Sequence, residues 1–162
     1  MQDYVVTPLV GIGPVRLGMT RETVLKAMPL PSRPFRKRKS SQHETDSFHH
    51  AGFQVFYAGE EPRVEFIELS RGAGFRVLFR DLDVFAETAE ELAEIISRDA
   101  PYDSQWREFP YAYIFRSLQL SLWRPVLPSS PSDLEGRSFS TIGIGRDGYY
   151  DDVALQIAGA DA

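Results

Sequence analysis

Leu17-Gly18-Met19-Thr20 is the stretch that decides the fold, because it sets the start of the first helix that the sequence predicts. The Thr20 hydroxyl can accept a hydrogen bond from a free backbone N–H group in the first turn, as a helix N-cap does. Met19 and Val24 have the spacing of a hydrophobic staple across that cap. Pro29 cannot continue a helix, so we expect the helix to end before it.

The same order of signals starts again further along the chain. Thr88 and Glu91 form a capping box, in which the threonine caps the first turn and the glutamate reaches back to the threonine N–H group. An apolar face at helical spacing follows from Ala89, Leu92, Ala93 and Ile96. We therefore predict a second helix, and with it a second helix-plus-sheet unit.

Strand signals accompany both predicted helices, as short apolar or alternating segments bounded by turn residues. Strands are expected at 4–10, 48–50, 53–58, 64–70, 75–79, 111–116, 118–124, 139–145 and 149–157. The polar stretches 32–46 and 125–136 are expected to be loops, the first of them mobile. The predicted fold class is α+β, an antiparallel sheet with two packed helices. The tandem lobes are residues 1–75 and 76–162, packed as one compact unit.

The stretch Arg16-Leu17-Gly18-Met19-Thr20-Arg21-Glu22-Thr23-Val24 resembles the helix entry of a known fold family. This family comprises the SmpA/OmlA (BamE-type) lipoproteins and the β-lactamase inhibitory protein family. The resemblance implies a helix that packs on an antiparallel sheet. In the β-lactamase inhibitory protein the unit occurs twice and an enzyme binds across the sheet faces. This chain departs from the family in having no cysteine for lipidation or disulfides, so no functional residue is carried over.

Composition excludes several classes of function. The 162-residue chain has a net charge of −5, so it lacks the electrostatic footprint of a nucleic-acid-binding protein. The absence of cysteine excludes disulfides and thiol catalysis. No apolar stretch approaches the ~20 residues that span a bilayer, and we expect no signal peptide, no membrane partner and a cytoplasmic protein. Nearly all of the 18 basic residues are arginine, which is typical of a GC-rich bacterial genome.

Gly143-Ile-Gly145-Arg-Asp-Gly148 matches the G-x-G-x-x-G pattern of dinucleotide-binding loops. Such a site needs the loop between a strand and a helix, with an acidic residue about 20 positions further on. Because the segment after the glycines is expected to be a strand, we interpret them as a hairpin turn. We expect no cofactor.

Three histidines, His43, His49 and His50, lie close together in the sequence. One of the last two could join His43 and Asp46 at a metal ion, but the spacing matches no known site, so we expect no metal. No serine lies in a G-x-S-x-G elbow, and the carboxylates of residues 81–94 fit the polar face of a capped helix. We therefore expect no catalytic residues.

A dense basic run lies in the first loop and comprises Arg33, Arg36, Lys37, Arg38 and Lys39. We call residues 33–39 the basic loop. A solvated loop explains this run, and a clamp for a phosphate or an acidic partner surface is the alternative. With Phe35 as its single aromatic residue, the basic loop offers no stacking platform for nucleic-acid bases.

Aromatic residues alternate with the apolar residues of several predicted strands. In Leu118-Gln-Leu-Ser-Leu-Trp123 the leucines share one face, which leaves Trp123 on the other. The same alternation predicts further aromatic residues on that outward face: Phe66, Tyr111, Tyr113 and Phe139. Such a face is typical of the core of a protein interface. Packing of the two lobes on each other, or a cover of long loops, is the alternative.

These observations predict a non-catalytic protein-binding module of the inhibitor, immunity or adaptor type rather than an enzyme. Its partner is expected to be another protein or a second copy of the chain. The predicted binding residues are Trp123, Tyr111, Tyr113, Phe66, Phe139 and Trp106. The alternative is a small-molecule binder or an enzyme with a pocket between the lobes, lined by Trp106, Tyr111 and Trp123.

Overall fold

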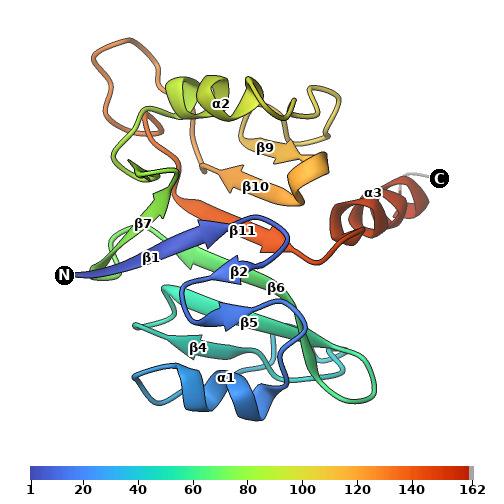
Figure 1. The fold of residues 1–162 in the computed structure, drawn as a ribbon. Helices are drawn as coiled ribbons and strands as arrows, with labels where there is room; N and C mark the ends of the chain where they lie inside the picture. The colour runs from blue at the N-terminus through green and yellow to red at the C-terminus, as the bar shows by residue number, and fades with distance from the viewer. Residues whose placement is uncertain (161–162) are drawn as a thin grey trace.

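A six-stranded antiparallel sheet forms the centre of the computed structural model, which describes residues 1–160 (Figure 1). The strand order in this large sheet is β4-β5-β6-β11-β10-β9. Its strands are Asp46–Phe48 (β4), Phe53–Ala58 (β5), Arg63–Ser70 (β6), Thr141–Gly145 (β11), Leu120–Trp123 (β10) and Ala112–Phe115 (β9). The central pair, β6 and β11, joins the two halves of the chain into one sheet.

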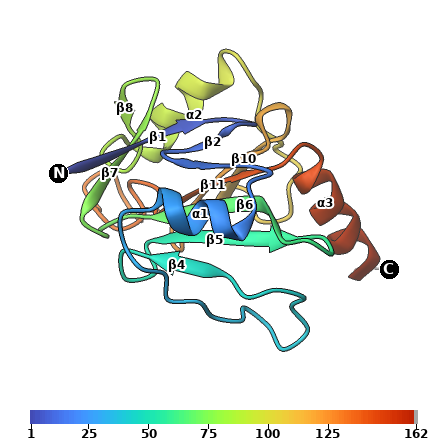
Figure 2. The same ribbon diagram turned by 60° about the horizontal axis from the view of Figure 1, so that its bottom comes forward.

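A second sheet of five strands, in the order β3-β2-β1-β7-β8, lies over the large sheet (Figure 2). Its strands are Gln2–Thr7 (β1), Gly11–Ile12 (β2), Val15–Arg16 (β3), Phe75–Phe79 (β7) and Leu82–Asp83 (β8). β1 and β7 run parallel, with Gln2 opposite Phe75 and Tyr4 opposite Val77. This small sheet therefore also combines strands from both halves of the chain.

Two capped helices begin where the sequence predicts them. Helix α1 spans Arg21–Ala27, and the Thr20 hydroxyl accepts a hydrogen bond from the Thr23 N–H group. Helix α2 spans Ala89–Ser97, and the Thr88 hydroxyl accepts from the Glu91 N–H group. The caps fix the first turn of each helix, because they satisfy backbone donors that have no partner within the helix.

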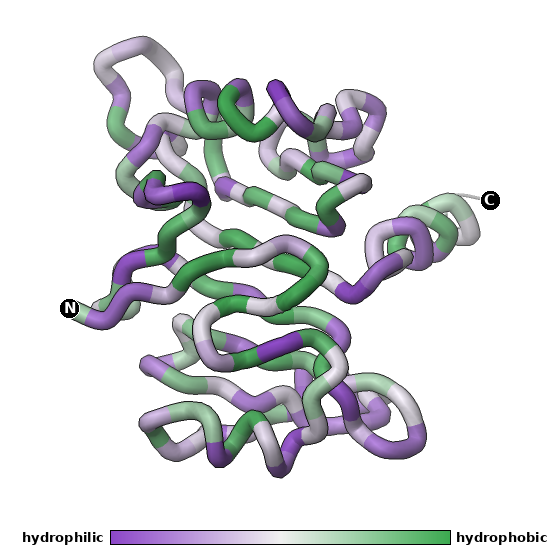
Figure 3. Tube along the Cα trace, in the orientation of Figure 1, coloured by the Kyte–Doolittle hydropathy of each residue, from purple (hydrophilic) through white to green (hydrophobic). Residues whose placement is uncertain are grey.

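The main core lies between the large sheet and the layer formed by α1, α2 and the small sheet. We call this side of the large sheet its inner face. Alternate strand residues point into the core, among them Val55, Ile67, Leu69, Leu120, Leu122, Ile142 and Ile144. Val24 of α1 and Leu92 of α2 pack against them, and Figure 3 shows the hydrophobic positions concentrated in these strands. Leu118, expected to share this face, lies instead in a 3₁₀ turn at Arg116–Leu118 before β10 and is only partly buried.

Helix α3, at Tyr149–Ala160, corrects the prediction of a strand at 149–157. Gly148 has a φ of +80°, which breaks the extended backbone after β11. The apolar residues that follow recur at helical spacing and pack on the sheet: Tyr150, Val153, Ala154 and Ile157. Packing on one side of a helix therefore outweighs the strand preference of the individual tyrosine, valine and isoleucine residues.

The fold is α+β, as predicted, although the described residues form three α-helices and two sheets. Each of the first two helices is followed by three antiparallel strands of the large sheet, β4-β5-β6 after α1 and β9-β10-β11 after α2. The expected lobe boundary, between residues 75 and 76, falls at the start of β7. Since both sheets include strands from the two halves, 1–160 is built as one continuous unit. A true sequence repeat stays a prediction.

Candidate functional site

The side of the large sheet that faces away from the main core, its outer face, is partly closed by α3. A second apolar cluster forms there from Phe66, Trp106, Ala112, Ile114 and Tyr150. Tyr149 stacks on Phe66 with ring centroids 4.6 Å apart. The Tyr150 hydroxyl donates to Ser121 Oγ, and its backbone N–H group donates to Gln119 Oε1 at 2.6 Å. These contacts fix the first turn of α3 to the sheet.

Four of the six predicted binding residues are buried, which corrects the prediction of an open aromatic face: Phe66, Trp106, Tyr113 and Phe139. Phe66 does lie on the outer face, but Tyr149 covers it. Tyr113 faces inward because it lies directly opposite Leu122 in the sheet, and opposite residues share a face. Phe139 precedes β11, so the alternation of that strand does not extend to it; its ring packs against Tyr113 in the main core.

The other two predicted residues, Trp123 and Tyr111, stay exposed, at 38% and 42% of their surfaces. Trp123 lies on the outer face, with Thr141 opposite it on β11 and Ala112 opposite it on β9. These neighbours are small, so neither can cover the indole ring. The chain after β10 adds two more exposed apolar residues, Val126 and Leu127.

The glycines of the G-x-G-x-x-G match make room for aromatic side chains. A Cβ atom at Gly143 would lie 2.4 Å from the Phe66 ring, and one at Gly145 would lie 2.5 Å from Tyr149 Cβ. The turn connects β11 to α3, which corrects the expected hairpin. The sheet around it is antiparallel, so the strand–helix–parallel strand unit of a dinucleotide site is missing from the described residues.

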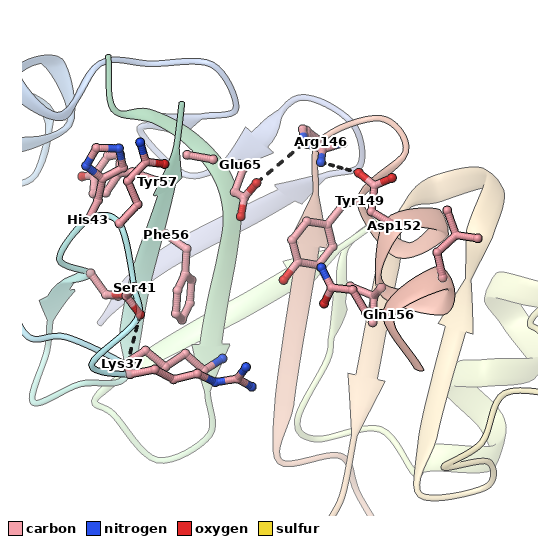
Figure 4. Close-up of a pocket in the computed structure, with 16 residues that line it drawn as sticks. Lys37, Ser41, His43, Phe56, Tyr57, Glu65, Arg146, Tyr149, Asp152 and Gln156 are labelled. Carbon is pink, nitrogen blue, oxygen red and sulfur yellow. Dashed lines mark hydrogen bonds and ion pairs between the residues drawn. The ribbon is translucent and has the colours of Figure 1, made fainter. Parts of the chain in front are cut away.

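A groove of ≈ 670 Å³ lies between α3 and the segment that contains the end of the basic loop (Figure 4). One wall comprises Lys37, Arg38, Ser41, Gln42 and His43, and the other comprises Tyr149, Asp152, Val153, Leu155 and Gln156. Between the walls the sheet contributes Phe56, Tyr57, Ala58 and Glu65. Sequence reasoning identified the basic wall but missed the helical one, which the spacing of Tyr149, Val153 and Gln156 could have indicated.

The charges of the groove are unevenly paired. Arg146 Nη2 lies 2.6 Å from Asp152 Oδ2, and Arg146 Nε lies 3.7 Å from Glu65 Oε2, so one guanidinium serves both carboxylates. Lys37 and Arg38 form no ion pair with any described carboxylate. The Lys37 ammonium instead lies 4.9 Å from the centre of the Phe56 ring. The groove therefore has a surplus of positive charge on one wall.

Two groups beside the groove have perturbed acidities. Burial raises the pKa of Tyr149 to about 12, and the nearby Glu65 and Glu68 carboxylates add to that shift. Burial also raises the pKa of Glu68, while the Lys37 charge opposes the shift. Tyr149 therefore keeps its proton throughout the physiological pH range and can donate a hydrogen bond from its hydroxyl group.

A buried carboxylate, Asp46, anchors the segment that carries the basic loop. The Arg21 guanidinium donates to both Asp46 oxygens at 2.9 Å, Ser32 Oγ donates to Oδ1 at 2.6 Å, and the Tyr57 hydroxyl donates to Oδ2 at 2.6 Å. Burial alone would raise the pKa of Asp46, but these hydrogen bonds outweigh it and lower the pKa. Backbone hydrogen bonds between Phe35 and Thr45 further tie the loop to the sheet.

A second buried ion, Arg124, lies beneath α2 with its side chain only 2% exposed. Its Nη2 atom lies 2.8 Å from Glu90 Oε1, and its Nη1 atom donates to the Gly136 carbonyl oxygen at 2.8 Å. Nε has no hydrogen-bond partner among the described residues. The inward position of Arg124 was not predicted from the sequence. The alternation of Leu120 and Leu122 extends to Arg124, so its side chain faces inward as theirs do.

The histidines do not converge. His43 Nε2 contacts the Gly59 carbonyl oxygen, and His49 Nε2 lies 2.7 Å from the Tyr4 hydroxyl. Within residues 1–160 no group of three or more histidine, aspartate and glutamate side chains could hold a metal ion. No helix in the described part of the chain is long and apolar enough to cross a membrane.

Comparison with known proteins adds no relative. No protein-family model, curated protein or solved structure matches this chain. Function is therefore inferred from two surfaces, the exposed end of the outer face around Trp123 and the groove beside α3.

Proposed function

We propose that this chain is a non-catalytic protein-binding module of the inhibitor, immunity or adaptor type. Its partner is another protein or a second copy of the chain. The observation that supports this proposal is the exposed side chain of Trp123 on strand β10, flanked by the small residues Thr141 and Ala112. Tryptophan is enriched among residues that dominate the energetics of protein interfaces. A bacterial origin and a cytoplasmic setting belong to the proposal as expectations from the sequence.

The resemblance of Arg16–Val24 to the BamE-type and β-lactamase inhibitory protein family supports the same proposal. The motif leads into α1, whose Val24 packs against the inner face of an antiparallel sheet. A second capped helix, α2, packs on the same face. In the β-lactamase inhibitory protein the unit occurs twice, and an enzyme binds across the sheet faces.

The alternative function, a small-molecule binder or enzyme with a pocket lined by Trp106, Tyr111 and Trp123, has less support. Trp106 is buried against Tyr150, with ring centroids 6.0 Å apart. None of the three residues lines the ≈ 670 Å³ groove. A tryptophan that is exposed on a sheet face, outside this groove, fits a flat protein interface better than an enclosed ligand site.

Replacing Trp123 with alanine is expected to weaken partner binding by about 2 kcal/mol or more, roughly thirtyfold in Kd. The partner is found by incorporating a photo-crosslinking phenylalanine analogue in place of the exposed Val126, which follows β10 and leaves the Trp123 indole intact, and identifying the protein that is crosslinked in cells. Calorimetry with the purified partner then compares the wild type with Trp123→Ala. If the crosslinked partner is the chain itself, sedimentation equilibrium measures the same loss.

Leu25→Ala is the matched control, because Leu25 is 38% exposed, as Trp123 is, and lies on α1, which packs on the inner face of the large sheet. This variant should bind the partner like the wild type. Equal affinities for wild type and Trp123→Ala would show that the indole is not the contact. A loss of about 3–5 kcal/mol in the free energy of unfolding of Trp123→Ala would show that its role is packing.

A further inference from the structure

We propose that the groove beside α3 binds a small organic anion that has a flat apolar body. This inference goes beyond the protein-binding proposal and uses different residues. Its basis is the combination of two unpaired cations on one wall with aromatic side chains in the floor and the opposite wall. The ≈ 670 Å³ volume lies within the range of small-molecule sites, which is about 300–1,000 Å³.

Lys37 and Arg38 supply the recognition of the negative charge. The two adjacent side chains line the groove without a carboxylate partner. The carboxylates of the groove, Glu65 and Asp152, are held by Arg146 and do not compete for them. Glu68 is the carboxylate whose field reaches Lys37, and burial disfavours its charged form. A ligand carboxylate or phosphate would therefore complete the charge balance of the basic wall.

Aromatic side chains supply the surface for the flat part of the ligand. Phe56 and Tyr149 line the groove, and both pack against the buried Phe66 ring, whose centroid lies 5.7 Å from that of Phe56 and 4.6 Å from that of Tyr149. Figure 4 shows Phe56 and Tyr149 facing the groove from its two sides, with the Tyr149 hydroxyl directed toward the space between them. Aromatic rings favour stacked or edge-on contact with another ring.

Polar groups around these rings can fix the orientation of the ligand. Tyr149 keeps its proton, because its pKa is raised to about 12, and its hydroxyl can donate to an anionic oxygen. Gln156 lies on the helical wall and Gln42 on the basic wall, and both carry amide donors and acceptors. The arrangement fits an aromatic carboxylate or an aromatic phosphate, which share this chemistry.

The test is a titration of the ¹⁵N-labelled protein with 2-naphthoate, monitored by amide chemical shifts. We expect saturable shifts confined to residues 37–43, 56–58 and 149–156. The neutral amide of the same ring, 2-naphthamide, should bind about tenfold more weakly or not detectably, since it lacks the charge. Titration with phenyl phosphate measures the affinity for an aromatic phosphate, which is compared with the affinity for the aromatic carboxylate. Shifts centred on Tyr111 and Trp123, or equal affinity for the neutral amide, would overturn the proposal.

The double variant Lys37→Glu/Arg38→Glu should weaken naphthoate binding by about tenfold or more, because two attractions become repulsions. Arg33→Glu/Lys39→Glu is the matched control: it changes the charge of the same loop equally, but neither residue lines the groove. An equal loss in both double variants would contradict a specific site.

The amide spectra report whether each variant is folded, and Lys37→Gln/Arg38→Gln should show a smaller loss of affinity. No outcome depends on Trp123, so this proposal and the proposed function can fail independently.

Discussion

Replacing Asp46 with alanine is expected to lower the free energy of unfolding by about 3 kcal/mol, because the hydrogen bonds to its charged carboxylate are lost and a buried donor is left without an acceptor. The carboxylate is 0% exposed and accepts hydrogen bonds from Arg21, Ser32 and Tyr57. Its removal leaves the buried Tyr57 hydroxyl without its acceptor and releases the segment before β4 from α1. Equilibrium denaturation with urea measures the change.

Glu22→Ala is the control for Asp46→Ala. Glu22 lies on α1, the helix that carries Arg21, and its replacement removes an exposed ion pair with Lys26. Its effect should stay within about 0.5 kcal/mol. A similar small effect for Asp46→Ala would contradict the buried network.

The Asp46→Asn variant tests the pH dependence that the same network predicts. The pKa of Asp46 is lowered from its ordinary value of 3.8 in the folded state, so ionisation of the carboxylate favours folding. The stabilisation is complete above the ordinary pKa and is lost as the pH falls through the folded pKa. The difference in stability between wild type and Asp46→Asn should therefore be constant near neutral pH and shrink in acid below 3.8. A difference that does not change with pH would exclude this role of the charge.

Replacing Glu90 with alanine is expected to destabilise the protein by about 3 kcal/mol or more, although Glu90 itself is largely exposed. The reason is its partner, since Arg124 is 2% exposed and would keep its charge in the interior with no carboxylate. The remaining acceptors of the guanidinium are the carbonyl oxygens of Gly136 and Pro110. Urea denaturation of the single variant measures the loss.

The double variant Glu90→Ala/Arg124→Met separates the cost of an unpaired charge from the cost of lost contacts. Methionine retains much of the apolar volume and removes the charge, so the double variant should be more stable than Glu90→Ala alone. Glu94→Ala, on the same helix, removes an exposed pair with Arg98 and should change stability by less than about 1 kcal/mol. Purely additive effects of the two substitutions would show that Glu90 and Arg124 are not coupled.

Local signals were sufficient to predict α1, α2 and most strands of the large sheet. Thr20 and Thr88 are strong caps, and the alternation in Phe75–Phe79 and Leu120–Trp123 identifies which residues are inside. Helix α3 was missed, because its tyrosine, valine and isoleucine residues favour strands when taken singly. Its first turn packs on Phe66, which is distant in the sequence and covered by Tyr149 in the structure, and no local pattern indicates that contact.

The candidate site could be predicted only in part for the same reason. Alternation correctly places Trp123 outside, because the leucines on either side of Ser121 are unambiguous. It fails for Tyr113, since Ala112 and Ile114 are also apolar and the face depends on pairing with β10. The basic wall of the groove is visible in the sequence, whereas the wall opposite exists only once α3 has formed.

The pairing of β6 with β11 has a consequence for how the chain assembles. These strands are joined through register pairs such as Ile67 with Ile144, which lie far apart in the sequence. Because closing so long a loop is entropically costly, we expect this pairing to form late in folding. Until then the eight-residue strand β6 presents an open edge. Strand β11 of another copy can pair with this edge through the same hydrogen bonds that join β6 and β11 within one chain. The glycine-containing turn at 71–74 would serve as the hinge. Refolding at high concentration is therefore expected to yield domain-swapped dimers, which size-exclusion chromatography separates from monomers and which revert only after unfolding.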